Sequence, residues 1–148
     1  MVWSVARFRD GGWNGRRCDH TTVRDYHRLE IWRRAHALAI AIHEVARGLR
    51  GNHFAGLRSQ LTRAADSVAA TIAEGCGAAS PREFARYLDM SIKSASETEY
   101  HLQSARDRGA LIDRRWRQLS GEAVSIRRMT YVYRKRLLDD DKDDDNTR

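Results

Sequence analysis

The chain has 148 residues, 41% of them hydrophobic and 32% charged, with a single proline, which excludes a disordered chain and fits one domain with long helices. Two cysteines far apart in sequence, Cys18 and Cys76, exclude a disulfide framework and indicate a cytoplasmic setting, while the lack of an apolar stretch of about eighteen residues excludes a membrane protein. The net charge is +7, and because the last ten residues hold six aspartates against Lys142 and Arg148, the remainder carries +11, which favours RNA or DNA as a partner.

The N-terminal segment shows no periodic pattern. It combines three glycines with scattered arginines, so we expect a basic, flexible arm over residues 1–24. A helical repeat follows between Arg28 and Leu49, where Gly48, Gly51 and Asn52 mark the end. Its apolar residues recur at intervals of four and three, namely Ile31, Ala35, Leu38, Ile42, Val45 and Leu49.

A second helix is predicted from Phe54 to Glu74. Its apolar face consists of Phe54, Leu57, Leu61, Ala65, Val68 and Ile72. Gly75 and Gly77 follow directly, and we expect them to end the helix as residues that tolerate positive φ.

The third helix has the clearest start signal in the chain. Ser80 matches an N-cap, Pro81 the first helical position, and Glu83 a residue that can bond back to the cap. The helix should stop near Gly109. Its seam is small and partly hydroxylated, which allows a close helix approach, and consists of Phe84, Leu88, Ser91, Ala95, Thr98, Leu102 and Ala105.

A fourth helix follows Asp113 as a candidate cap and is expected to end before the aspartates, leaving an acidic, disordered tail over residues 139–148. Its stripe is Ile112, Trp116, Leu119, Ala123, Ile126, Thr130, Tyr133 and Leu137. Four helices over residues 25–138 with short connections predict an all-α fold, an antiparallel up-down four-helix bundle.

Three large apolar residues fall off the predicted seams. Trp32, Ile40 and Met90 would be exposed to water in a monomer, so we expect them to form the interface of a homo-oligomer. The alternative is that they are isolated exposed hydrophobic residues without a partner.

Three segments resemble one known family. Residues 63–75 read RAADSVAATIAEG, residues 83–88 after Ser80 read EFARYL, and residues 93–99 read KSASETE. This pattern is similar to that of the four-helix bundle proteins associated with intervening sequences of 23S ribosomal RNA genes. Thr71 and Lys93 depart from it, standing where the family has asparagine and glycine. The residues that match it are Arg63, Ser67, Glu74, Gly75, Ser80, Glu83, Phe84, Ser94 and Glu97.

The resemblance implies a ring-like homopentamer without known catalytic activity. The chain is also similar, at the level of the fold, to the accessory protein of diversity-generating retroelements, a basic pentameric bundle that binds a reverse transcriptase and its template RNA. A reverse transcriptase is therefore one expected partner, through an analogy of fold alone.

The fourth helix is rich in cations that can contact phosphates without reading bases. The alternative is a solvated basic face, and the acidic tail could compete with nucleic acid for it. The candidate contact residues are Arg114, Arg117, Arg127, Arg128, Arg134, Lys135 and Arg136.

No metal, cofactor or catalytic site is predicted. His36 with His43, and Cys18 with His20, lack further ligands at recognisable spacing. Glu97 precedes His101 by four residues, whereas a di-iron bundle needs a spacing of three.

The remaining polar residues near the seams have structural explanations. Glu74 and Glu97 could form a buried acid pair, but capping of a turn is the commoner role. Ser67 and Ser94 should hydrogen-bond back into their helices. We therefore expect a non-enzymatic, oligomeric accessory protein that binds RNA or DNA, or alternatively a scaffold that recruits a protein such as a reverse transcriptase.

Overall fold

The fold is known from a computed structural model that describes residues 24–146, so the expected arm lies almost wholly outside the described residues. Four long helices make up the structure: α1 (Glu30–Gly48), α2 (Ala55–Gly75), α3 (Pro81–Asp107) and α4 (Asp113–Asn146). Two short 3-10 turns, η1 (Tyr26–Arg28) and η2 (Asn52–Phe54), precede α1 and α2. The described residues contain no strand, which confirms the all-α fold.

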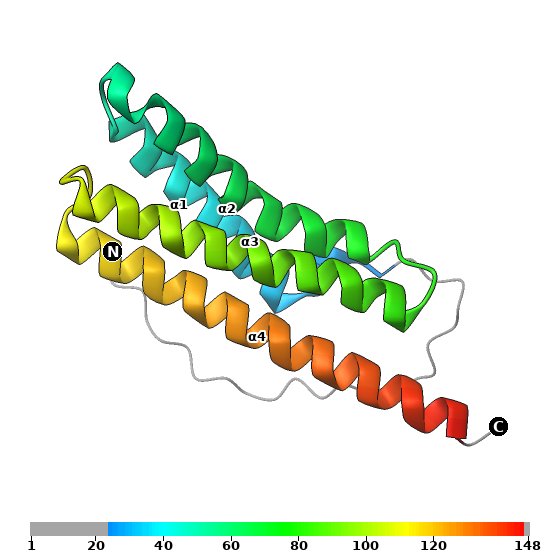
Figure 1. Cartoon of the computed structure of the whole chain (residues 1–148). Coiled ribbons are helices and arrows are strands. Elements are labelled where there is room, and N and C mark those ends of the chain that lie inside the picture. The colour runs from blue at the N-terminus through cyan, green and yellow to red at the C-terminus, as the bar shows by residue number, and fades with distance from the viewer. Residues whose placement is uncertain (1–23, 147–148) are drawn as a thin grey trace.

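The four helices enclose one core. The α3 helix packs against α2 and α4, while α1 packs against α2 and, less extensively, against α4. Figure 1 shows the turns after α1 and after α3 at one end of the molecule and the turn after α2 at the other. The predicted stripes supply the core, and its fully buried large side chains include Ile42, Leu61, Ile72, Phe84 and Ile126.

The α4 helix is longer than the sequence predicted. It continues through the aspartates to Asn146 instead of ending before them, so the predicted acidic tail is helical that far. Asp141 pairs with Arg82 at the start of α3 over 3.2 Å, and Asp139 lies 3.9 Å from Lys142 one turn later. These ion pairs support the extension.

The turn between α2 and α3 is built differently from the prediction at its glycines. Among the described residues, only Gly51 and Gly109 have positive φ, at 96° and 69°. Gly75 still belongs to α2, and a Cβ there would lie 2.5 Å from Cδ2 of Phe84. Gly75 is therefore required by the close approach of Phe84, and not by its backbone angle.

The N-cap of α3 is confirmed. The Ser80 hydroxyl accepts a hydrogen bond from the Glu83 backbone N–H over 3.1 Å. Glu83 in turn accepts from the N–H of Ala79 at 2.8 Å, one residue before the cap and not at the cap itself.

Removing the capping hydroxyl should destabilise the fold measurably. We expect Ser80→Ala to lower the free energy of unfolding by about 1 kcal/mol, because the Glu83 N–H loses its acceptor. Urea denaturation followed by circular dichroism measures the change. Ser80→Asp should restore most of the loss, and an alanine variant as stable as the unmodified protein would contradict the role of the cap.

Candidate nucleic-acid interface

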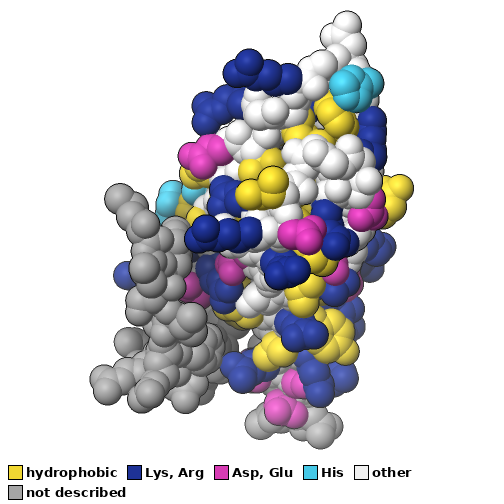
Figure 2. All heavy atoms as spheres, turned by 90° about the vertical axis from the view of Figure 1, so that its left-hand side faces the viewer, with side chains coloured by type: hydrophobic (Ala, Val, Ile, Leu, Met, Phe, Trp, Pro, Cys, Tyr) yellow, Lys and Arg dark blue, Asp and Glu magenta, His cyan; other side chains and the backbone are white. Residues whose placement is uncertain are grey.

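The outer face of α4 carries an exposed row of cations. With about 100° per residue, Arg117, Arg128 and Lys135 lie within about 20° of one another and opposite the buried Ile126. All three are exposed, as are Arg114 and Arg136. Figure 2 shows Lys and Arg side chains spread over one side of the molecule with hydrophobic side chains between them. We use the name α4 outer face for these five cations together with Tyr131, namely Arg114, Arg117, Arg128, Tyr131, Lys135 and Arg136.

Tyr131 is an aromatic member of this face that the sequence prediction missed. Its side chain is 58% exposed, and it lies between Arg128 and Lys135 along α4. The neighbouring Val132 is 47% exposed. Cations interleaved with an exposed aromatic ring form the combination that binds single-stranded nucleic acid, because the ring stacks on a base while the cations contact phosphates.

Two predicted contact residues have another role. Arg127 lies 3.3 Å from Glu99 and donates to the Ser96 hydroxyl over 3.2 Å, and Arg134 lies 2.6 Å from Asp89. Both are partly buried and bind α3. These ion pairs give both residues a structural role within the protein, and we therefore leave them out of the face described here, while their predicted contact with nucleic acid stays a prediction.

An ion pair with α1 fixes the other flank of α4. The Arg34 guanidinium donates to both Glu122 carboxylate oxygens at 2.7 Å and to the Ser125 hydroxyl at 3.0 Å. The hydrogen bonds to Glu122 raise the pKa of Arg34 above its ordinary value. Held from both sides, α4 presents a defined outer face to solvent.

The first turn of α4 is tied to the end of α3. Arg106 donates to Asp113 over 2.7 Å, and its guanidinium lies 4.3 Å above the centre of the Trp116 ring. The hydrogen bond from Arg106 holds the pKa of Asp113 below its ordinary value. Arg117 lies only 3.9 Å from the same carboxylate and is 72% exposed, so it stays available to a ligand.

The two family-motif serines lie where α2 contacts α3. The hydroxyl groups of Ser67 and Ser94 hydrogen-bond to each other across the two helices over 2.9 Å. Ser91 donates to the Val68 carbonyl at 2.9 Å, and Thr71 donates to the Ser67 carbonyl at 2.7 Å. The two motif serines thus join neighbouring helices, where the prediction had each bonding back into its own helix.

The structure excludes the alternative that Glu74 and Glu97 form a buried acid pair, because both residues are exposed. Arg63 and Lys93 are exposed as well. Glu97 lies 3.5 Å from His101 one turn later on the same helix.

The histidines considered as metal ligands have other neighbours. His43 lies 2.9 Å from Asp66, and the ring of His36 stacks on Trp32 with centroids 4.9 Å apart. Within residues that the structure describes, no three His, Cys, Asp or Glu side chains group closely enough to hold a metal ion. No described helix is long and apolar enough to span a membrane.

The predicted interface residues differ in exposure. Ile40 and Met90 are 51% and 48% exposed, as expected. Trp32 is partly buried, because it packs against the edge of the core beside Tyr26, with ring centroids 4.8 Å apart. Residues of the turn η1 thus cover part of the surface that we expected to be exposed in a monomer, and the interface stays a prediction.

Comparison with known proteins finds one matching family and a similar solved structure. A family model described as 23S rRNA-intervening sequence protein matches residues 27–132. A solved structure described as a protein with unknown function from the S23 ribosomal protein family, from Bacteroides thetaiotaomicron VPI-5482, is similar with a TM-score of 0.67 and 21% identity. The similarity covers 71% of this chain and 98% of that chain, and at this identity it concerns the fold alone. No curated protein matches the chain.

Proposed function

The chain belongs to the 23S rRNA-intervening sequence protein family, and we propose that it is a non-enzymatic accessory protein that binds RNA through the α4 outer face. The family description links such proteins to an rRNA insertion, which makes RNA the first ligand to test. The observation that carries the proposal is the exposed row of Arg117, Arg128 and Lys135 with Tyr131 between the last two. Contacts of this kind recognise phosphates and stacked bases without reading a sequence.

We extend the proposal to assembly, in which an up-down bundle forms a ring-like homopentamer. Ile40 lies on α1 and Met90 on α3, and these two helices lie on opposite sides of the core. Exposed apolar residues on opposite sides favour a head-to-tail contact, and such contacts form a ring where the rotation between subunits closes. A ring would repeat the α4 outer face and strengthen binding to one RNA through multivalency. Light scattering coupled to chromatography measures the subunit number.

Loss of two cations from the α4 outer face should weaken RNA binding and its salt dependence together. We expect Arg128→Gln with Lys135→Gln to lower the slope of log K against log salt by about 1.5–2, because about two phosphate contacts are lost. Fluorescence anisotropy with a structured RNA at several salt concentrations measures both quantities.

The chain offers a closely matched control. Arg86 and Lys93 are exposed on α3, have the same spacing of seven residues, and remove the same charges when replaced with glutamine. An equal loss of binding in this control would reduce the effect to net charge and contradict the assigned face. If the unmodified protein bound no RNA at low salt, the RNA proposal would be wrong. A protein partner retained after nuclease treatment would then support the scaffold.

A further inference from the structure

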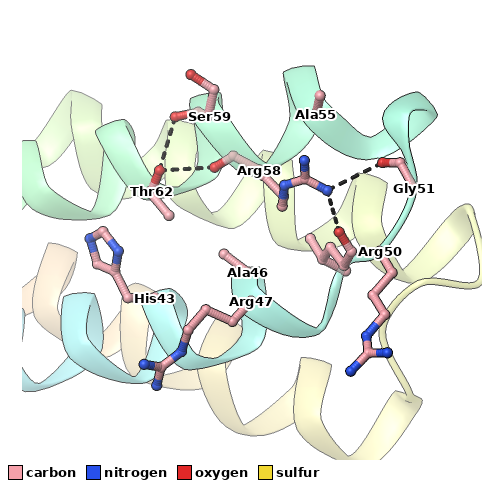
Figure 3. A pocket seen from close by; sticks show the side chains of 10 residues that line it. His43, Ala46, Arg47, Arg50, Gly51, Ala55, Arg58, Ser59 and Thr62 are labelled. Carbon is pink, nitrogen blue, oxygen red and sulfur yellow. Dashed lines mark hydrogen bonds between the residues drawn. The ribbon is translucent and has the colours of Figure 1, made fainter.

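A second basic feature lies in the groove between the end of α1 and the start of α2. One wall is lined by His43 and Ala46 of α1. The opposite wall is lined by three residues of α2, namely Arg58, Ser59 and Thr62 (Figure 3). The turn that joins the helices closes one end of the groove at Gly51. The walls are therefore fixed by two packed helices and the turn between them.

The groove is positively charged. Three arginines, Arg47, Arg50 and Arg58, belong to its lining, and none of the lining residues is a carboxylate. The nearest acid identified by a contact is Asp66, which lies 2.9 Å from His43. Arg47 and Arg50 are exposed, and neither has an ion-pair partner within the described part of the chain. Uncompensated guanidinium groups at one groove favour an anion.

Arg58 removes the main obstacle to an anion at this position. The C-terminal end of a helix carries unpaired carbonyl groups and a partial negative charge, which repels anions. Here the Nη1 atom of Arg58 donates to the carbonyl of Leu49 and, at 3.2 Å, to that of Gly51. These bonds fix the guanidinium at the groove, and its other N–H groups donate to no residue within the described part of the chain.

The groove lies at the same end of the molecule as the first turn of α4. Arg108, just after α3, donates to the His53 carbonyl over 2.8 Å and lies 4.8 Å above the ring centre of Phe54. These contacts join the turn between α1 and α2 to the turn between α3 and α4. Both turns are at one end in Figure 1, and α4 begins there with the exposed Arg114.

We propose that this groove binds a backbone phosphate of the RNA that lies on the α4 outer face. The inference rests on the proposed function and adds a second contact to it. Arg47 and Arg50 supply the charge at the rim, and Arg58 supplies a fixed donor on the opposite wall. The RNA runs from the α4 outer face over the two joined turns into the groove.

The test uses the full chain and the same RNA. Arg47→Gln with Arg50→Gln should weaken binding about tenfold at about 0.1 M salt and lower the salt slope by about 1.5–2, as expected for two lost phosphate contacts. Both residues are exposed and unpaired, so we expect circular dichroism and the melting temperature to stay unchanged. Arg86→Gln with Lys93→Gln again serves as the control for net charge.

The outcomes separate this inference from the proposed function. If R128Q/K135Q loses affinity and R47Q/R50Q behaves like the control, the groove assignment is overturned and the α4 outer face remains. If both pairs lose affinity beyond the control, the RNA spans both surfaces. Inorganic phosphate should compete with RNA for binding to the unmodified chain but not for binding to R47Q/R50Q. This difference would further support an anion site in the groove. If the unmodified chain binds no RNA, both proposals are overturned.

Discussion

Replacing Phe84 with alanine should lower the free energy of unfolding by about 3–5 kcal/mol, as for other large aromatic residues in a packed core. The Phe84 side chain is fully buried, and its ring meets the Tyr133 ring edge-on with centroids 5.9 Å apart. The Arg24 guanidinium lies 5.0 Å from the ring centre on another side. Alanine would leave a cavity among α2, α3 and α4 that these packed helices cannot close fully.

Urea denaturation at a fixed protein concentration measures this loss, because assembly would make stability depend on concentration. Phe84→Leu should cost less, since it keeps most of the buried volume. A loss for alanine of about 1 kcal/mol or less would mean that the helices collapse onto the site, contrary to a tightly packed junction.

The sequence predicted the helices because each had its own local signals. The stripe of α1 and the cap at Ser80 depend on residues within a few turns, and both are present in the structure. The far end of α4 had no such signal. Its extension is supported by Arg82 pairing with Asp141, two residues 59 positions apart, and such a contact is known only when the helices are placed.

In the candidate site, too, the sequence predicted what depends on local pattern and not what depends on contacts between helices. Arg117, Arg128 and Lys135 were placed correctly by helical angle alone, because residues opposite the buried stripe face solvent. Arg127 and Arg134 lie on the flank, about 100° and 80° from Ile126, where the register of the neighbouring helix decides the environment. The groove at the α1–α2 turn was not predicted from the sequence. Arg58 is held there by hydrogen bonds to backbone carbonyl groups, and a pattern of residue types does not show such bonds.

The opposite expectations for two glycines of α2 test the packing at the end of that helix. On helix propensity alone, alanine in place of either glycine should stabilise the protein, by less than the value of about 0.5–1 kcal/mol for a helix interior, because both lie at the ends of α2. At Gly56 a new Cβ would meet nothing within 4 Å, so Gly56→Ala should show this gain. At Gly75 the Cβ would lie 2.5 Å from Phe84 Cδ2 and 2.8 Å from the Cβ of Tyr87.

We therefore expect Gly75→Ala to destabilise the protein by about 1–3 kcal/mol, because the overpacked junction must separate α2 from α3. The change in sign between the two variants, measured in the same urea series, is the diagnostic result. In a Phe84→Ala background the cost of Gly75→Ala should shrink, since one of its two clashes is gone while that with Tyr87 stays. A Gly75→Ala variant that gained stability as Gly56→Ala does would show that α3 can move away freely, and the tight α2–α3 junction would then not be what holds Gly75 in place.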